Sequence, residues 1–145
     1  MAPIPVKILR QGAILPTYGS CEAAGPDLYA CLEAPVTIEP GKTAFVPTGI
    51  AMEVPKGCAG LVYARSGLAC KRGLAPANKV GVVDSDYRGE IMVALHNHAS
   101  TPQRIENGER IAQMVITPVL TPEYRIVPEL SDTGRGTGGF GSTGK

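Results

Sequence analysis

The chain has 145 residues, of which 43% are hydrophobic and 19% charged, and its formal net charge is +1. This length suits one compact domain, and the small net charge excludes a global electrostatic attraction to nucleic acid or to acidic membranes. The 18 Gly and 13 Pro favour short strands joined by turns, while the absence of Trp and the 2 Phe imply an aliphatic core, so an all-β domain is expected.

Cysteine spacing and hydropathy indicate the cellular compartment of the protein. The four cysteines are too scattered for a CxxC pair or a zinc-ligand pattern, and we interpret them as free thiols in a reducing compartment. No apolar run approaches the roughly 20 residues that span a bilayer, and the first residues lack a secretory hydrophobic core. These features predict a cytoplasmic protein with no membrane or nucleic-acid partner.

Strand signals begin near the N-terminus and follow each other closely. Brief β-branched or aliphatic stretches separated by Pro and Gly turns cover residues 6–10, 27–32, 36–38, 43–46, 50–54 and 60–63. This spacing predicts a sandwich or barrel. Residues 66–71, which precede Gly73, form the one expected helix, and it is too short to be stable alone.

Two longer strands are expected over residues 90–98 and 110–119. Both carry apolar residues on alternating and non-alternating positions, which predicts burial of both faces. Because one small sandwich would struggle to cover both faces, a subunit interface is expected on one of them. From residue 131 the composition becomes Gly-rich with almost nothing to pack, so the end of the chain is expected to be mobile.

Two early motifs carry candidate binding groups. In AAGPDLYA (residues 23–30), Asp27 stands where a turn meets a strand, and turn chemistry alone is an equally good interpretation. In RSGLA (residues 65–69), an Arg precedes a hydroxyl residue and a Gly at the start of the expected helix. Exposed N–H groups beside an Arg predict an anion site.

Two later motifs carry candidate catalytic groups. In GVVDSDYRG (residues 81–89), an apolar strand leads into two carboxylates and an aromatic ring; Asp84, at the strand edge, could act as a general base, or the motif could be a plain hairpin loop. In GERIAQMV (residues 108–115), Gln113 lies among core residues and needs a partner, which the backbone could supply.

The fifth motif, residues 135–145, superficially matches a P-loop. It lacks the preceding strand, the Ser or Thr after the Lys, and the following helix, so that interpretation fails. Gly-rich backbone with an Arg and hydroxyls still suits the wrapping of phosphates, and Phe140 has no packing role in such a tail.

Two histidines invite other interpretations. His96-Asn97-His98 spells HNH, but the nuclease site needs a ββα metal unit and these residues lie within one expected strand. The two histidines share a strand face and could ligate a metal, yet the sequence indicates no third ligand.

In this order the five motifs closely resemble those of the trimeric dUTPase family, over nearly the full length of the chain. AGPDLYA, RSGLA, GVVDSDYRGEI, GERIAQMVI and RGTGGFGSTG stand for the first to the fifth. Departures are small: Pro26 stands where the family usually has another residue, and Ala64 where Pro is common. Neither position carries a charge.

The resemblance implies a jelly-roll-like β-barrel or sandwich subunit with one short helix and a flexible Gly-rich tail, in a homotrimer that shares its active sites. It implies hydrolysis of dUTP to dUMP and pyrophosphate by water attack on the α-phosphate, with Mg²⁺ as cofactor. Asp84 would activate the water and Gln113 would help hold it. Asp27 would contact Mg²⁺ through water.

The remaining implied roles concern the substrate. Phosphate contacts are implied for Arg65, Ser66, Gly67, Arg110, Arg135, Gly141, Ser142 and Thr143. Asn78, Gly81 and Val83 would read uracil in a hairpin that excludes thymine, Tyr87 would exclude a ribose hydroxyl, and Phe140 would cover the base.

The resemblance also implies a division of the chain into two parts and suggests two alternative functions. Residues 1–133 would form the β domain and residues 134–145 a mobile lid. The rivals are a dCTP deaminase, which shares the fold but lacks the Asp-Ser-Asp-Tyr arrangement, and a non-catalytic nucleotide-binding regulator, which would not need Asp84 as a base.

Overall fold

A computed structural model describes residues 3–139 of the chain. Its elements are β1 (Val6–Ile8), β2 (Asp27–Tyr29), β3 (Val36–Ile38), β4 (Thr43–Pro47), β5 (Ile50–Met52), β6 (Cys58–Tyr63), α1 (Ser66–Arg72), β7 (Leu74–Pro76), β8 (Gly81–Val83), β9 (Met92–Asn97), β10 (Gln103–Ile105) and β11 (Arg110–Pro118). Every strand pairing is antiparallel. The expected all-β fold with one short helix is confirmed, and it is of the jelly-roll type.

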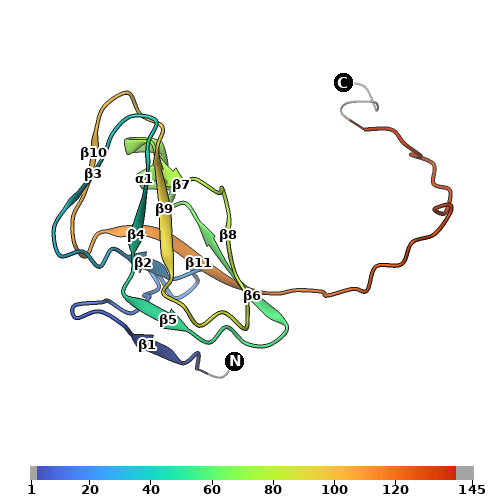
Figure 1. The fold of residues 1–145 in the computed structure, drawn as a ribbon, viewed down its shortest axis with the longest axis horizontal. Coiled ribbons are helices and arrows are strands. Elements are labelled where there is room, and N and C mark those ends of the chain that lie inside the picture. The colour runs from blue at the N-terminus through green and yellow to red at the C-terminus, as the bar shows by residue number, and fades with distance from the viewer. Residues whose placement is uncertain (1–2, 140–145) are drawn as a thin grey trace.

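Two sheets hold the core between them. One has the strand order β2-β11-β6-β8 and the other β4-β9-β7, while β1-β5 and β10-β3 form two smaller pairs (Figure 1). Leu28 and Ile111 of the first sheet belong to the same buried cluster as Val46, Val93 and Leu95 of the second. The core is aliphatic, as the composition predicts.

Strands β9 and β11 bury one face more completely than the other. In β9, Val93 and Leu95 are buried and Ala94 and His96 are half-buried; β11 shows the same contrast between Met114 and Val115. The expected burial of both faces is therefore incomplete within one subunit. The uncovered face is available to a second chain.

Helix α1 is short because local chemistry ends it at Gly73. Gly73 takes a left-handed conformation (φ 66°) and donates its N–H to the carbonyls of Leu68 and Ala69, which ends the helix as the sequence predicts. Only Leu68 is buried, so tertiary contact holds the helix on one side.

Some expected strands are shorter than predicted, and two were missed. Residues 9 and 10 leave β1 because the Ala13 N–H donates to the Arg10 carbonyl in a turn. Strands β7 and β10, each of three residues, were not predicted because so few residues give no periodic signal.

Beyond β11 the chain leaves the body of the subunit. Residues 119–137 are exposed and run away from both sheets (Figure 1). Leu120, Tyr124, Ile126 and Leu130 within this segment are each at least 87% exposed. Such a row of large apolar side chains needs a surface that its own subunit does not supply.

Asn97 fixes the end of β9, and its removal tests the packing of this sheet. The fully buried amide donates to the Ile38 and Thr101 carbonyls and accepts from the Ala99 N–H. We expect Asn97→Ala to lower the free energy of unfolding by about 2–4 kcal/mol, since buried partners lose their hydrogen bonds. The control is Asn107→Ala, which removes one acceptor in an exposed loop; an equal loss in urea unfolding for both variants would contradict the prediction.

Candidate functional site

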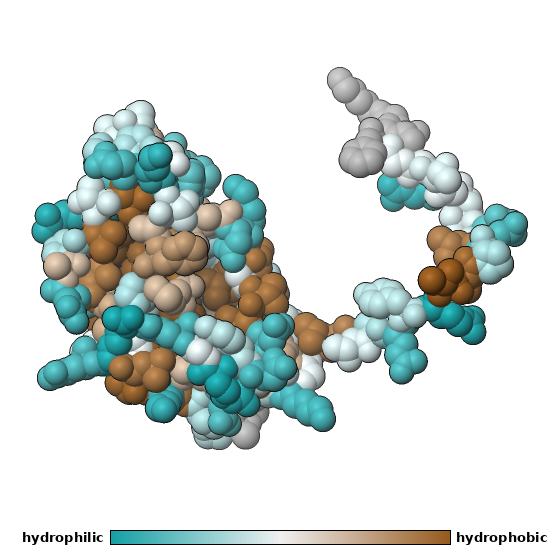
Figure 2. Space-filling view, viewed as in Figure 1, coloured by the Kyte–Doolittle hydropathy of each residue, from teal (hydrophilic) through white to brown (hydrophobic). Residues whose placement is uncertain are grey.

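The first of two candidate binding cavities lies where the turn between β7 and β8 approaches the exposed face of β4 and β9. A hairpin was expected here, but β7 pairs with β9 and β8 with β6, so the turn joins the two sheets. The cavity encloses about 470 Å³. This hairpin cavity is lined by Phe45, Val62, Pro76, Asn78, Gly81, Val82, Val83, Asp84, Tyr87, Glu90, Ile91, Met92, Val93 and Ala94. Figure 2 shows a largely apolar face in this region, framed by hydrophilic side chains. Its chemistry suits a flat organic group that needs a few polar contacts.

Asp84 and Tyr87 are the two ends of one turn at the mouth of the hairpin cavity. Strand β8 ends at Val83, so Asp84 follows an apolar strand as predicted, and the Tyr87 N–H donates to the Asp84 carbonyl at 3.2 Å. The Arg88 guanidinium donates to the carbonyls of Ser85 and Tyr87 at 2.8 and 2.9 Å. Arg88 therefore closes this turn, a role that the sequence did not indicate.

The turn between β7 and β8 is tight. A Cβ on Gly81 would lie 3.3 Å from both the Asn78 amide nitrogen and the Val62 Cβ, so glycine permits the amide to reach over the strand. Lys79 takes a left-handed conformation (φ 64°) at the tip, which non-glycine residues seldom adopt. Asn78, Gly81 and Val83 thus gather at one cavity, as the sequence predicts.

The second candidate cavity is small and cationic. This arginine cavity encloses about 240 Å³ and is lined by Gly19, Ala23, Gly25, Asp27, Arg65, Ser66, Gly67, Arg110 and Gln113. Its position depends on Gly25, where a Cβ would collide with the Met114 carbonyl of β11. The first, second and fourth motifs therefore meet here.

Asp27 is held between two arginines. Arg65 Nε lies 2.6 Å from one carboxylate oxygen and Arg110 Nη1 lies 3.2 Å from the other. Two guanidinium groups face one carboxylate, so the pair of arginines retains positive charge for an anion. The sequence named all three residues but did not predict these ion pairs, because the residues lie on β2, on the N-cap of α1 and on β11.

Gln113 has its polar partner in the backbone, as the structural alternative predicted. Its amide nitrogen donates to the Ala64 carbonyl at 2.9 Å, which leaves the side-chain oxygen as an acceptor beside the arginine cavity. Ser66 and Gly67 begin α1 next to it. Arg65, the N-cap, makes no side-chain cap hydrogen bond.

The two cavities lie at opposite edges of the four-stranded sheet. Asp27 is on β2 and Asp84 follows β8, and β11 and β6 lie between them. Three strand spacings amount to about 14 Å. Gln113 is on β11, two strand spacings or about 10 Å from β8. A general base must come within about 3 Å of the proton it takes, so Asp84 and Gln113 of one chain do not reach the same water molecule.

Arg135, the described tail residue with an expected role, lines neither cavity of its own chain. Arg135 is exposed and donates to the Gly138 carbonyl at 2.8 Å. Phe140, Gly141, Ser142 and Thr143 lie outside the described residues.

His96 and His98 form a pair, without the surroundings of a nuclease centre. Their ring centroids are 4.5 Å apart, and His96 Nδ1 lies 2.9 Å from the Thr43 hydroxyl. Desolvation, with smaller contributions from His96 and Lys79, lowers the pKa of the exposed His98. Within residues 3–139, no group of three or more His, Cys, Asp and Glu is placed to hold a metal ion, and strand β9, which carries His96, is followed by no helix in that part of the chain.

The cysteines and the helix agree with the expectations from composition and hydropathy. All four cysteines, at positions 21, 31, 58 and 70, are free thiols. Among the described residues, the short helix cannot cross a membrane.

The chain thus has two cavities of different chemistry. The apolar cavity, which carries an amide, suits a nucleotide base, and the cationic cavity suits phosphates. The dUTPase family model matches residues 11–144. A deoxyuridine 5′-triphosphate nucleotidohydrolase of Desulfitobacterium hafniense is 56% identical over 90% of this chain and 87% of its own. One from Anaeromyxobacter sp. is 48% identical over 99% of both chains. The chain therefore belongs to the dUTPase family, a family of enzymes.

Solved structures agree with this assignment. The dUTPase of Staphylococcus bacteriophage 80alpha with dUPNHPP has a TM-score of 0.91 and 31% identity, and each chain is covered completely. A variant of the dUTPase from phage phi11 of S. aureus, described as coordinating a structural Mg(II) ion, has a TM-score of 0.82 at 25% identity, over 90% of this chain and all of that one. Neither a deaminase nor a regulator without activity is favoured by these relatives.

Proposed function

We propose that the protein hydrolyses dUTP to dUMP and pyrophosphate, with the nucleoside in the hairpin cavity of one subunit and the triphosphate in the arginine cavity of another. The observation that carries this proposal is the separation of the two cavities across the four-stranded sheet. Each cavity has the chemistry of one half of the nucleotide, and one chain cannot join them.

The nucleoside half selects by shape and by hydrogen bonding. The Asn78 amide and the backbone at Gly81 and Val83 read the edge of uracil, and the tight turn between β7 and β8 leaves no room for a thymine methyl. Tyr87, at the cavity mouth, lies under the deoxyribose and excludes a 2′-hydroxyl. A site built this way rejects cytosine because a buried polar group would lose its partner.

The phosphate half binds through charge. Arg65 and Arg110 each use one nitrogen on Asp27 and offer their other N–H donors to phosphate oxygens, and Ser66 and Gly67 present the start of α1 to the same anion. Arg135 of the lid adds a further positive charge. Ionised partners of this kind form the stronger hydrogen bonds of a site.

Asp84 acts as the general base. It takes a proton from a water molecule that attacks the α-phosphorus, and pyrophosphate leaves. The free oxygen of Gln113 accepts a hydrogen bond from the same water, which holds it in line. Since the two side chains lie in different cavities of one subunit, they come from different subunits at each site.

The residues present fit a Mg²⁺ ion that arrives with the nucleotide. Both Asp27 oxygens are engaged by arginines and no three-carboxylate cage occurs in the described part of the chain. Mg²⁺ commonly keeps several waters and binds through phosphates with one or two carboxylates, so Asp27 would contact it through water. When bound, the ion neutralises charge on the triphosphate.

A homotrimer follows from the shared site and from the exposed apolar surfaces. The exposed residues Phe45, Val82 and Met92 at the hairpin cavity, the half-covered face of β11 and the apolar row of residues 120–130 all lack cover within one chain. A neighbouring copy covers them and completes each site. Four free thiols support a cytoplasmic location for this assembly.

Residues 134–145 act as the lid of a domain that spans residues 1–133. Six of these twelve residues are Gly, so ordering them costs backbone entropy that nucleotide contacts offset. Arg135, Gly141, Ser142 and Thr143 contact phosphates, and Phe140 stacks on uracil, which contributes roughly 1 to 3 kcal/mol for an aromatic ring on a base.

The direct test of the reaction is pyrophosphate release from dUTP, dTTP, dCTP and UTP, each with Mg²⁺ present or chelated. We expect strong preference for dUTP and loss of turnover on chelation. Asp84→Asn keeps the shape but removes the base, so turnover should fall by about 10² to 10⁴ with nucleotide still bound. Comparable turnover of dCTP or UTP, or full activity of Asp84→Asn, would sink the proposal.

Shared sites are tested by mixing two inactive variants. Asp84→Asn and Gln113→Ala damage different cavities, so mixed trimers should regain activity at about a quarter of the sites, because each intact site needs one chain of each kind in fixed order. The measurement is turnover after joint refolding, with each variant refolded alone as control. If the mixture stays as inactive as its components, both residues come from the same chain.

The lid is tested by ending the chain after Asp132. We expect trimer mass and the thermal midpoint without ligand to stay near wild type, while turnover drops on the order of 10³-fold because the Arg135 charge is lost. Arg125→Gln, in the same exposed segment but before the lid, is the matched control and should retain turnover. A truncated protein with normal turnover would refute the lid.

A further inference from the structure

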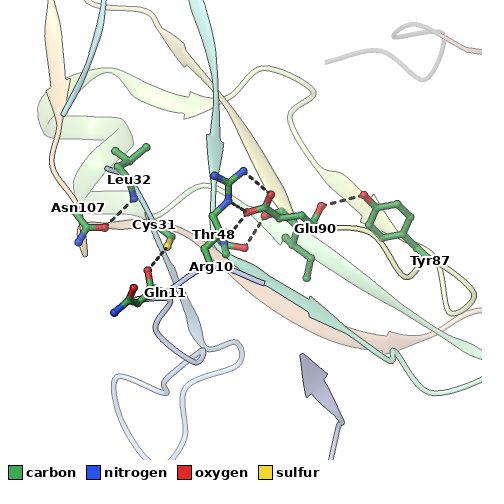
Figure 3. A network of polar contacts seen from close by, with 10 residues as sticks. Arg10, Gln11, Cys31, Leu32, Thr48, Tyr87, Glu90 and Asn107 are labelled. Atoms are coloured by element: carbon green, nitrogen blue, oxygen red, sulfur yellow. Dashed lines mark hydrogen bonds and ion pairs between the residues drawn. The ribbon is translucent and has the colours of Figure 1, made fainter. Parts of the chain in front are cut away.

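Glu90 joins the N-terminal segment to the turn that carries Tyr87. Its carboxylate receives three hydrogen bonds: from Arg10 Nε at 2.7 Å, from Arg10 Nη2 at 2.9 Å and from the Gly49 N–H at 2.9 Å. The two bonds from Arg10 form a fork on both oxygens, the geometry that fixes a carboxylate most firmly. Figure 3 shows Glu90 between the Arg10 guanidinium on one side and the Tyr87 ring on the other.

The backbone of Glu90 in turn holds the Tyr87 ring. The Tyr87 hydroxyl donates to the Glu90 carbonyl at 3.0 Å (Figure 3). Gly89 lies between them and permits this approach, because a Cβ there would collide with the Tyr87 hydroxyl. Tyr87 is 46% exposed, so packing alone restrains it weakly and this hydrogen bond is a principal restraint on the ring.

The backbone next to Glu90 is held by residues 48–50. The Ile91 N–H donates to the Ile50 carbonyl at 2.9 Å, and the Thr48 hydroxyl donates to the Ile91 carbonyl at 2.6 Å. The Glu90 carbonyl shares a planar peptide unit with the Ile91 N–H, so the bond to Ile50 restrains its direction from the backbone. Arg10 adds a second restraint, through the Glu90 side chain, on the residue whose carbonyl holds the Tyr87 ring.

We propose that Arg10 is a positioning residue for sugar discrimination, acting through Glu90 on the Tyr87 ring. The proposal rests on the role given above to Tyr87 and adds a residue that lies 80 positions away from Glu90 in the sequence. Arg10 lines neither candidate cavity and touches no nucleotide in this scheme. It aligns the ring that excludes the ribose hydroxyl.

A purely structural ion pair is the competing explanation. The Arg10 side chain is 46% exposed, and half-exposed pairs stabilise proteins little. The Arg10 hydrogen bond is the largest contribution that lowers the pKa of Glu90, so the carboxylate is charged and the fork is formed at neutral pH. If the pair served stability alone, its loss would change the thermal midpoint and leave sugar selectivity unchanged.

The experiment measures kcat/KM for dUTP and for UTP in Arg10→Gln, Arg10→Lys, Tyr87→Phe and the double variant Arg10→Gln/Tyr87→Phe. Arg10→Gln should lower the dUTP-over-UTP ratio about three- to tenfold, the order expected when one restraining hydrogen bond is weakened. Arg10→Lys should fall between it and wild type because it keeps the charge but loses the fork. In the Tyr87→Phe background the same change should alter the ratio by less than about twofold, since the two residues act in series.

The matched control is Arg104→Gln, which breaks an exposed pair with Glu106 (2.6 Å) away from both cavities and should leave the ratio unchanged. An unchanged ratio in Arg10→Gln, or an equal loss with and without the Tyr87 hydroxyl, would overturn the proposal. A crystal structure of Arg10→Gln gives a second readout: the Tyr87 hydroxyl should leave the Glu90 carbonyl, and an unmoved ring contradicts the proposal. If the wild-type protein shows no preference for dUTP, the proposed function fails. The position of the Tyr87 ring in the Arg10→Gln crystal structure then decides whether Arg10 positions that ring.

Discussion

Three strand spacings in the four-stranded sheet separate the carboxylate Asp27 from the turn that carries Asp84. Because β-strands lie at a fixed distance from their neighbours, no side-chain movement closes a gap of about 14 Å. This constraint gives the chain two separate cavities and leaves apolar surface around one of them. In the proposed trimer, assembly and chemistry would both follow from this strand order.

The arginine cavity keeps a net positive charge in a single chain. Asp27 accepts from Arg65 and Arg110 together, so a lone subunit holds two guanidinium groups against one carboxylate. The carboxylate keeps the two arginines in place without cancelling both charges. Because the arginines are already in place, binding an anion costs little reorganisation free energy, which is the general advantage of a preorganised site.

Local features of the fold were predictable from the sequence, and long-range ones were not. Gly73 marks the end of α1 and the apolar run before Asp84 marks β8, because both signals are contained in a few neighbouring residues. The order of the five motifs predicted the family. The strand order was not predictable, since pairing of Asp27 with Gln113 depends on contacts between residues far apart in the chain.

The candidate site shows the same difference between local features, which were predictable, and long-range ones, which were not. Tyr87 and Arg65 were identified by motif and Asn78 by the family resemblance, and their gathering into two cavities came only from the structure. Phe45 and Met92 line the hairpin cavity but carry no sequence signal, because exposed apolar residues occur on any strand. The Arg10–Glu90 pair gave no signal either, as single charges far apart in sequence are common.

The place of β11 has a consequence for how the molecule forms. This strand is the last among the described residues, yet it lies between β2 and β6 and pairs with both. While the chain is being synthesised, β6 can pair only with β8, and β2 lacks its strand partner, until residue 118 has left the ribosome. The larger sheet must then close in one late step, around a strand that arrives from the end of the polypeptide. Native pairing of this non-local kind is slow, so the nascent chain spends that interval with open strand edges and depends on its short, Gly- and Pro-punctuated strands to avoid pairing with other chains.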